Sequence, residues 1–302
     1  MARRGVFQIP RRPFYIAWQQ GRLYAVGMSN VVAIQGQSAS FHDTASRQFF
    51  GDAIRLVCCD LPFSTVFDAL EQPTTDYAVC AIENSLYGAI NDVYDLLVAR
   101  RPWICGEVRL RIEQCLIGLP QSSIGKIAAV HSHPVALAQC EAFLKEHLPQ
   151  ATRLEADDTA GSVAMIAEIG DPTKAAIASA EAAAAYGMKV LQRSIETNHQ
   201  NFTRFAVLSR QPSSYEHATK TSAVIELPHE PGALHAALGA FAKERINITL
   251  LVSRPVVGKP GEYRFYIDFA SGLQEARTAR ALHALERIAT TIIILGSYRA
   301  AD

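Results

Sequence analysis

The sequence predicts an α/β protein of two or three domains, in which a larger part built on parallel strands precedes a smaller α+β module. The chain has 302 residues, which is too long for one ordinary core. Short apolar runs alternate with helical patterns as far as residue 210, and this alternation is typical of a parallel sheet covered by helices. After a polar break over 211–221 the pattern becomes strand-helix-strand-strand-helix-strand, which is the order of a ferredoxin-like module.

Composition and charge limit the partners of such a protein. Hydrophobic residues make up 49% of the chain and charged residues 19%, as in a globular protein. Lys plus Arg equals Asp plus Glu at 29 each, so the chain has no excess charge that would attract nucleic acid or an anionic membrane. We therefore expect neither as a partner, and a small anionic ligand must be bound by local donors.

The first 28 residues do not match the pattern of the rest. Arginines at 3, 4, 11 and 12 precede a short apolar patch that is too brief and too polar for a signal sequence. No run of about 18 apolar residues occurs in the chain, so no membrane span is predicted. We expect residues 1–28 to be an N-terminal extension outside the fold.

The cysteines and histidines indicate a reduced protein without a metal. The six cysteines lie at 58, 59, 80, 105, 115 and 140, several of them inside apolar runs and none in a Cys-x-x-Cys spacing. This pattern predicts buried, reduced thiols and a cytoplasmic location. His131 and His133 lack further ligands at suitable spacing, so we expect no metal.

Polar residues follow the first predicted strands. Strands are expected at 29–35, 54–59 and 77–82, and helices at 44–50, 62–70 and 91–97. Ser40 lies in the turn after the first strand, and Glu83, Asn84 and Ser85 follow the third, where ligands bind in open α/β sheets. The same residues could instead cap the following helices. The turn at 36–43 lacks the glycine spacing of a nucleotide loop, so nucleotide binding is rejected.

A second group of elements follows a strand over 108–118 that we expect to cross into a second lobe. Strands are expected there at 127–130, 152–156 and 175–178, and helices at 133–147, 159–168 and 179–186. Thr159 begins one of these helices beside the supposed cleft, and helix capping is an alternative explanation for a hydroxyl at that position.

The segment 201–205 places three polar groups before the short apolar run 206–208. Arg204 can bind a carboxylate through two parallel hydrogen bonds. Thr203 can donate to a reacting oxygen, and Asn201 can donate or accept. The alternative is a strand edge with a surface ion pair.

The carboxyl-terminal module is predicted to oligomerise or to sense a ligand. Strands are expected at 222–227, 246–253, 262–269 and 290–295, and helices at 233–244 and 273–287. A small sheet with an exposed edge commonly pairs with a copy of itself.

Taken together, these segments resemble prephenate dehydratase over residues 31–298. The matching stretches are 36–45, 82–85 with Gly88, 132–134, 158–160 and, without a mismatch, Asn-x-Thr-Arg-Phe at 201–205. The tail is similar to that family's ACT domain at 231–234, 253–255 and 295–298.

The resemblance implies a fold and a reaction. The fold has two α/β lobes like those of a periplasmic binding protein, with the active site between them, and a ferredoxin-like ACT domain. The expected boundaries are an extension at 1–28, a catalytic domain at 29–210 with crossovers near 108 and 190, a linker at 211–221 and the ACT domain at 222–302. The implied activity is the loss of water and carbon dioxide from prephenate, giving phenylpyruvate for phenylalanine biosynthesis without a cofactor.

The resemblance also implies roles for single residues. Thr203 would donate to the departing hydroxyl, Asn201 would orient it, and Arg204 would anchor a substrate carboxylate or the groups around it. Glu83 could supply the proton instead, if burial favours its protonated form. The residues expected to contact substrate are Ser40, Ala39, Asn84, Ser85, Thr159 and Phe205.

The ACT domain is expected to bind phenylalanine in a homodimer or homotetramer. The residues implied are Gly232, Ala233, Leu234, Asn247, Ser253 and Arg254. Some positions depart from the family pattern. Ala39 replaces a glycine and should not easily adopt positive φ, and His42 replaces a serine. In the tail, Val252 and His235 replace the usual glutamate and valine.

Two other functions remain open from the sequence. Arogenate dehydratase performs the same chemistry on a substrate that carries an ammonium group. A non-catalytic amino-acid sensor would only bind in the cleft, but the complete 201–205 motif argues against it.

Overall fold

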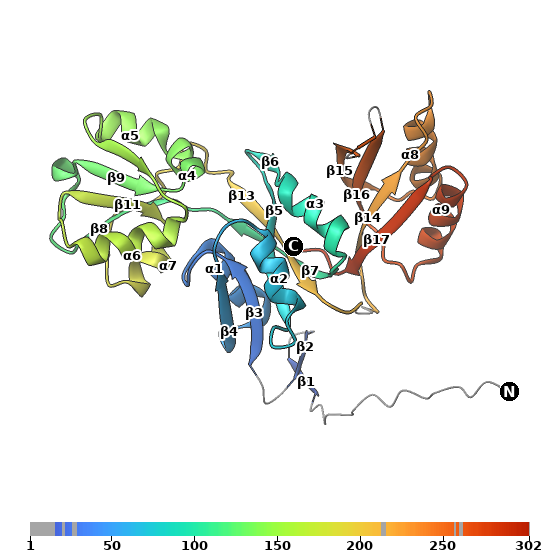
Figure 1. Cartoon of the computed structure of the whole chain (residues 1–302), viewed down its shortest axis with the longest axis horizontal. Coiled ribbons are helices and arrows are strands. Elements are labelled where there is room, and N and C mark those ends of the chain that lie inside the picture. The colour runs from blue at the N-terminus through green and yellow to red at the C-terminus, as the bar shows by residue number, and fades with distance from the viewer. Residues whose placement is uncertain are drawn as a thin grey trace.

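The computed structural model describes residues 29–212, 216–256, 258–259 and 262–301. Before them it gives the backbone of two short antiparallel strands, β1 (Ile16–Gln19) and β2 (Arg22–Ala25). The rest of the predicted extension over 1–28 lies outside the described residues. In Figure 1 a first lobe lies in the middle, a second lobe on one side of it and the carboxyl-terminal domain on the other.

The first lobe is built on a sheet with the strand order β4-β3-β5-β13-β7. Its elements are β3 (Asn30–Gln35), α1 (Phe41–Phe50), β4 (Ile54–Cys59), α2 (Ser64–Glu71), β5 (Tyr77–Asn84), β6 (Gly88–Ala89), α3 (Asn91–Arg100), β7 (Trp103–Arg111) and β13 (Phe202–Ser209). Strand β3 pairs parallel with β4 and β5, whereas β13 runs antiparallel to both β5 and β7. Strand β13 therefore returns from the second lobe into the first sheet and starts at the carboxyl end of β5.

The second lobe has the strand order β10-β9-β11-β8-β12. Its elements are β8 (Cys115–Gly118), η1 (Ile124–Lys126), β9 (Ala129–Ser132), α4 (Pro134–Gln139), α5 (Glu141–His147), β10 (Thr152–Glu155), α6 (Thr159–Ile169), β11 (Lys174–Ala178), α7 (Ala180–Ala185) and β12 (Lys189–Gln192). The prediction of one helix over 133–147 was wrong, because Cys140 leaves helical geometry and separates α4 from α5.

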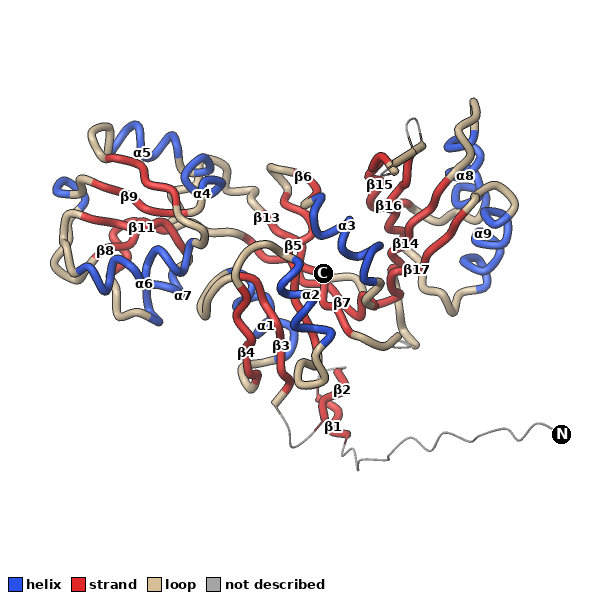
Figure 2. The backbone as a smooth tube through the Cα atoms, viewed as in Figure 1, coloured by secondary structure: helices blue, strands red, loops and turns tan. Residues whose placement is uncertain are grey.

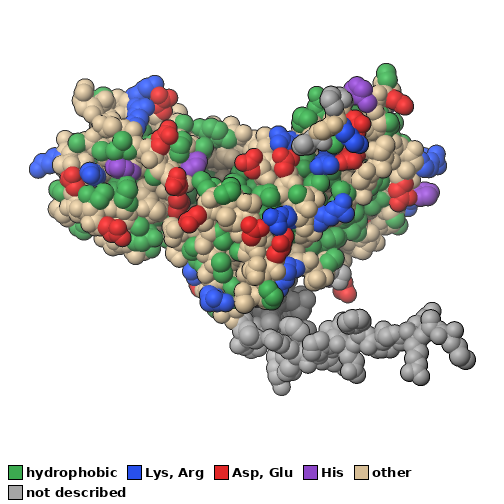
Figure 3. Space-filling model, in the orientation of Figure 1, with side chains coloured by type: hydrophobic (Ala, Val, Ile, Leu, Met, Phe, Trp, Pro, Cys, Tyr) green, Lys and Arg blue, Asp and Glu red, His purple; other side chains and the backbone are tan. Residues whose placement is uncertain are grey.

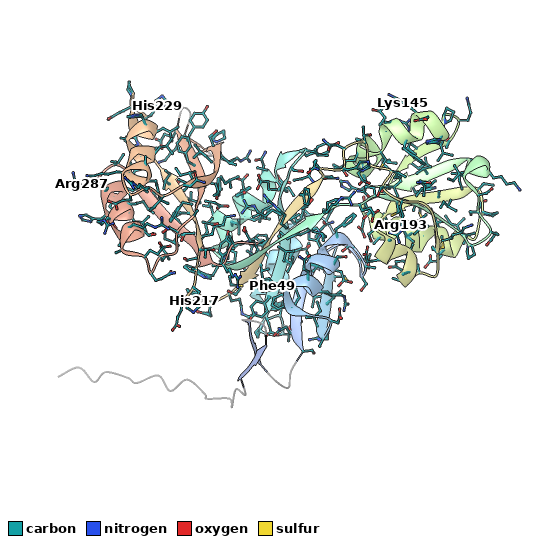
Figure 4. The ribbon with its side chains drawn as sticks, turned by 180° about the vertical axis from the view of Figure 1, so that it is seen from behind. Phe49, Lys145, Arg193, His217, His229 and Arg287 are labelled. Carbon is teal, nitrogen blue, oxygen red and sulfur yellow. The ribbon has the colours of Figure 1, made fainter. Side chains whose placement is uncertain are left out.

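Two crossover segments, 112–114 and 193–201, join the lobes, and hydrogen bonds connect them to each other. The Ile112 N–H donates to the Asn201 carbonyl at 2.8 Å, and the Ser194 hydroxyl donates to Glu113 Oε1 at 2.6 Å. Arg193, labelled in Figure 4, begins the second segment. The strand predicted over 108–118 is interrupted by the first crossover, since β7 ends before it and β8 starts after it.

The carboxyl-terminal domain has the predicted ferredoxin-like order of elements. They are β14 (Lys220–Glu226), α8 (Ala233–Lys243), β15 (Ile248–Pro255), β16 (Tyr263–Phe269), α9 (Ala276–Glu286) and β17 (Thr291–Tyr298). The strand order is β15-β16-β14-β17, and every pairing is antiparallel. Figure 2 shows α8 and α9 on the face of this sheet that points away from the first lobe.

The opposite face of this sheet packs against the first lobe. Tyr266 and Tyr298 are buried in one hydrophobic cluster with Tyr94 of α3 and Ile104 of β7. Gly296 allows this approach, because a Cβ there would overlap the Ile104 carbonyl group. The domain and the first lobe thus share a core, in which burial of apolar surface stabilises their contact.

The cysteines are all free thiols, but not all of them are buried. Cys58 is exposed, so the prediction of buried thiols was wrong at that position. None of the helices in the described part of the chain is long and apolar enough to cross a membrane.

Candidate functional site

The residues predicted to act together fall into two groups along the junction between the lobes. Figure 3 shows a broad depression in the surface between the second lobe and the carboxyl-terminal domain, above the first lobe. One group lies where β5 ends and β13 begins, since Thr203 and Asn84 are register partners on these antiparallel strands. The other group lies at the turn after β3, where the second lobe touches the first.

Thr203 is held in place by Asn84. Its side chain is buried apart from 8% of its surface, and Oγ1 accepts a hydrogen bond from Asn84 Nδ2 at 3.0 Å. The same amide nitrogen donates to Asn201 Oδ1 at 2.8 Å, and Asn84 Oδ1 accepts from the N–H groups of Leu86 and Tyr87. A hydroxyl that accepts a bond in this way keeps its own proton free to donate to a ligand oxygen.

The other polar groups beside Thr203 differ in what they can offer. Asn201 is fully buried, and its Nδ2 has no hydrogen-bond partner among the described residues. A buried donor without a partner is costly, but Asn201 has no exposed surface that a ligand could reach in this structure. Ser85, by contrast, donates to the Gln200 carbonyl at 2.7 Å and accepts from the Phe202 N–H at 2.9 Å. Asn84 and Ser85 therefore shape the site, and their hydrogen bonds do not leave them as the carboxylate cradle that we expected.

Arg204 does not lie where the prediction of a carboxylate anchor needs it. Successive residues of a strand point to opposite faces, so Arg204 faces away from Thr203. Its Nε donates to Glu83 Oε2 at 2.9 Å and its Nη1 to Asp268 Oδ2 at 2.6 Å, and the side chain is only 7% exposed. The correction is that Arg204 anchors protein groups, which was the second of the two roles we considered.

Glu83 also fails the geometry required of a proton donor. It is the register partner of Arg204 and faces the same side of the sheet, away from Thr203. Its carboxylate accepts the Arg204 Nε–H, so it forms part of the ion cluster behind the site. The idea that Glu83 supplies the proton to a group beside Thr203 is therefore abandoned.

The turn after β3 contacts the second lobe. The Gln37 N–H donates to Asp158 Oδ2 at 3.2 Å, and the Ser179 hydroxyl donates to the Ala39 carbonyl at 3.2 Å. Gly36 has φ +85° and a Cβ there would lie 3.2 Å from the Asp158 carboxyl carbon, so glycine fits this approach. A carboxylate of the protein thus occupies the turn that we expected to bind a ligand anion.

Ala39 and Ser40 shape the same turn. Ala39 has φ 64°, so the expectation that alanine would avoid positive φ was wrong, and its N–H donates to Asp43 Oδ2 at 2.8 Å. Ser40 is the predicted N-cap of α1, because its Oγ accepts from the Asp43 N–H at 3.4 Å. Thr159 is half-buried at the start of α6 and makes no hydrogen bond with its hydroxyl among the described residues. It remains available to a ligand.

Phe205 and His42 lie in the core beneath Thr203. Phe205 is 1% exposed and packs edge-on against the His42 ring at a centroid distance of 5.0 Å, so it has no free surface for substrate and the prediction that it contacts substrate was wrong. The pairing of β13 with β5 shifts register between Arg204 and Phe205. His42 Nε2 accepts the Ala81 N–H at 3.2 Å beside this irregularity. Burial lowers the pKa of His42 from 6.5 to about 4, so its imidazole is neutral and can accept.

A cavity of about 580 Å³ opens between the lobes beside the turn after β3. Its lining includes Ser38, Ala39 and Arg47 from the first lobe and Glu181 and Ala185 from the second. Thr203 is not part of this lining, so the two groups of predicted residues do not share one cavity in this conformation.

The residues predicted to bind an effector lie at the start of α8 and along β15. Gly232 has φ +85° and begins α8, where Ala233 and Leu234 follow. Asn247 precedes β15, and Ser253 is exposed near its end. Arg254 Nη2 lies 2.6 Å from Asp95 Oδ2 of α3, so in this chain it links the two domains.

Sequence reasoning missed two carboxylates. Asp158 was noted only within the matching stretch 158–160, without a role of its own. An aspartate before Thr-Ala is an N-cap signal, and it accepts from the Ala160 and Gly161 N–H groups. Asp268 carries no sequence signal, because its contact with Arg204 joins residues from different domains.

The chain has two α/β lobes joined by paired crossovers, and a threonine hydroxyl lies at their junction. A ferredoxin-like domain packs behind this site. These features define a two-lobed enzyme with an appended regulatory-type domain. A model of the family described as prephenate dehydratase matches residues 32–213, and a model of the ACT domain matches residues 221–287. The chain belongs to the prephenate dehydratase family.

Individual relatives agree with this assignment over most of the chain. Arogenate dehydratase/prephenate dehydratase 2 of Arabidopsis thaliana is 37% identical over 278 residues, which cover 88% of this chain and 72% of the relative. A solved prephenate dehydratase of Arthrobacter aurescens in complex with L-Phe has a TM-score of 0.80 and 31% identity, covering 89% of this chain and 90% of the other. A structure described as GqqA, a novel type of quorum quenching acylase, has a TM-score of 0.81 and 32% identity, covering 90% and 98%.

Proposed function

We propose that this chain converts prephenate to phenylpyruvate, a step of phenylalanine biosynthesis, with Thr203 assisting the departure of the ring hydroxyl. The observation that carries this role is the hydrogen bond from Asn84 Nδ2 to Thr203 Oγ1. This bond fixes the oxygen and leaves the hydroxyl proton free, which is what a donor to a leaving oxygen requires.

The reaction needs orientation and charge stabilisation more than a strong base. The bond from the ring to the carboxylate carbon breaks, its electron pair enters the ring, and the ring carbon–oxygen bond breaks as carbon dioxide and hydroxide leave. The new aromatic ring supplies the driving force. A threonine hydroxyl is too weak an acid to give up its proton at neutral pH, so Thr203 stabilises the departing oxygen by a hydrogen bond, and hydroxide takes its proton from water.

Substrate carboxylates need donors close to Thr203. The uncommitted Thr159 hydroxyl lies at the N-terminus of α6, where a helix favours an anion. Asn201 Nδ2 is an unpaired donor beside Thr203, but it is fully buried, so a ligand reaches it only when the side chains around it move. Ala39 and Ser40 contribute through the shape of the turn after β3. Thr203 is not among the residues that line the cavity between the lobes.

Regulation by phenylalanine and self-association are part of the proposal. The support is the ACT domain and the relative solved with L-Phe. Strand β15 is an edge of its sheet and exposes 41% of Leu251, a surface that a second copy would cover to form the expected homodimer or homotetramer. The six free cysteines fit a cytoplasmic location.

Arogenate is a second candidate substrate, since one relative carries the names of both activities. Acyl transfer, the activity named for the similar GqqA structure, is less well supported for this chain. The hydroxyls of Ser40, Ser85 and Thr203 make no described hydrogen bond to a histidine ring, and such a pair is the usual way to activate a nucleophile.

The direct test is an assay of the purified full-length chain with prephenate and with arogenate, with and without phenylalanine. We expect phenylpyruvate and carbon dioxide from prephenate and inhibition by phenylalanine, and the ratio of kcat/KM on the two substrates decides between prephenate and arogenate. Binding of prephenate without any product would contradict the proposal and favour a sensor.

A further inference from the structure

A cluster of four buried charges joins the catalytic sheet to the ACT domain directly behind Thr203. Arg204 and Glu107 come from the first lobe, and Lys220 and Asp268 come from the ACT domain; each is 8% exposed or less. Arg204 Nη1 lies 2.6 Å from Asp268 Oδ2 and 3.1 Å from Glu107 Oε2, and Lys220 Nζ lies 2.8 Å from Glu107 Oε2. These two cations and two carboxylates lie where an unpaired charge would be strongly unfavourable, and the more exposed Glu83 adds a third carboxylate at 2.9 Å from Arg204 Nε.

The Arg204 guanidinium divides its hydrogen bonds between the two domains. Within the first lobe it donates to Glu83 and Glu107, and from Nη2 to the Tyr94 hydroxyl at 3.2 Å. Asp268 is its partner from the ACT domain, at the shortest of these distances. Burial alone would lower the pKa of Arg204, but the surrounding acidic groups, Asp268 foremost, raise it well above its usual value. The charge on Arg204 is therefore permanent.

The position of the Arg204 backbone determines the position of Thr203. The two residues are neighbours on β13 and project from opposite faces, so a shift of the strand at Arg204 also moves Thr203. The ladder between β13 and β5 is irregular immediately after Arg204. The ladder between β13 and β7 is regular from Phe202 to Val207, so the side-chain anchors of Arg204 fix β13 mainly relative to β5 and to the ACT domain.

The cluster also has room to rearrange. A cavity of about 200 Å³ adjoins it and is lined by Arg204, Lys220, Glu107, Thr249 and other residues of both domains. Because space lies beside these side chains, their charges and hydrogen bonds decide where the guanidinium sits. Changing one carboxylate is therefore expected to move Arg204 without opening the hydrophobic interface around Tyr94 and Tyr266.

We propose that Asp268 of the ACT domain is a positioning residue for the dehydration: by binding Arg204 it holds β13 so that Thr203 meets the departing hydroxyl. The proposal rests on the function proposed above for Thr203. The ACT domain then contributes to the working geometry of the site even when no effector is bound. Any ligand that displaces β16 (Tyr263–Phe269) would act on Thr203 through the same contact.

The test compares two variants that each convert an aspartate to asparagine at the same domain interface. Asp268→Asn removes the carboxylate that binds Arg204. Asp95→Asn is the control, because Asp95 Oδ2 also lies 2.6 Å from an arginine of the other domain, Arg254, but is half-exposed and forms no described hydrogen bond or ion pair with β13. In the full-length protein we expect Asp268→Asn to lower kcat about tenfold or more with little change in KM, and Asp95→Asn to leave kcat unchanged.

Two further variants separate positioning from folding. Asp268→Glu keeps the charge but displaces the carboxylate by one methylene, so a folded protein with lowered kcat is expected even if Asp268→Asn unfolds. In a Thr203→Val background, Asp268→Asn should cause no further loss of kcat, because its effect passes through the missing hydroxyl.

The outcomes distinguish this proposal from the proposed function. If the unmodified chain forms no phenylpyruvate, the proposed function itself fails. If the unmodified chain is active while folded Asp268→Asn and Asp268→Glu both keep its kcat, or if Asp268→Asn lowers kcat equally with and without Thr203, the positioning role is overturned and the function stands.

Discussion

Acidification is expected to destabilise this protein through a single buried histidine. His42 is 9% exposed, its Nε2 accepts the Ala81 N–H at 3.2 Å, and its ring packs against Phe205. Burial lowers its pKa from 6.5 to about 4. Protonation would replace the acceptor by a second donor and place a charge in the core beneath Thr203, so the folded state resists it.

The sign and size of the effect follow from the two pKa values. The imidazole of the unfolded chain binds a proton below about 6.5, whereas that of the folded chain does so only below about 4. Between these values the unfolded state binds more protons, so the free energy of unfolding falls as the pH falls. At about 1.4 kcal/mol per pH unit, the loss reaches about 3 kcal/mol by pH 4 and stops there, and above pH 6.5 nothing is lost.

Urea unfolding of the wild type and of His42→Gln between pH 7 and pH 4 measures this directly. Glutamine can accept the Ala81 N–H but does not titrate in this range, so the carboxylates that do titrate contribute equally to both proteins. We expect the stability difference between the two proteins to shift in favour of the variant by about 3 kcal/mol over the range. A stability difference between the two proteins that stays constant from pH 7 to pH 4 would refute the assignment of a buried neutral His42.

The remaining predictions concern the site and the domain interface. Asn84→Asp should lower kcat about 10²-fold at neutral pH, because a carboxylate would accept the Thr203 proton that the leaving oxygen needs, and activity should recover towards low pH; a pH-independent kcat would contradict this. Gly296→Ala should destabilise the fold by about 2 kcal/mol, since its Cβ meets the Ile104 carbonyl. Gly239→Ala in α8 is the control, because nothing lies within 4 Å of that Cβ, and it should stabilise by about 0.5–1 kcal/mol. Urea unfolding compares the two glycine variants, and equal effects would exclude the clash.

The alternation of strands and helices could be predicted because it depends on local pattern. The meeting of Asn84 with Thr203 was expected only from the family resemblance, since no spacing in the sequence says that β13 runs antiparallel beside β5. The face of the sheet from which Arg204 projects could not be predicted. Strand alternation places Thr203 and Arg204 on opposite faces, but it does not say which face meets the cleft. The partner of Arg204 is Asp268, 64 residues away in another domain, and no spacing predicts such a contact.

Ala39 shows a different limit. Its propensity disfavours positive φ, at a cost of about 1–2 kcal/mol. Hydrogen bonds from its N–H to Asp43 and from Ser179 to its carbonyl override that preference. Local preference is reliable for elements with a clear period and fails where contacts from another lobe fix a single residue.

The hydroxyl of Thr203 is tested most directly by the turnover of prephenate in Thr203→Val, with Thr203→Ser as the control that restores the hydroxyl. Valine keeps the shape of the strand residue and removes the hydroxyl, both as a donor to the substrate and as the acceptor from Asn84. We expect kcat to fall about 10²-fold or more in the valine variant and to be largely restored in the serine variant. A valine variant that forms phenylpyruvate within a few fold of the wild-type rate would contradict the proposed role of Thr203.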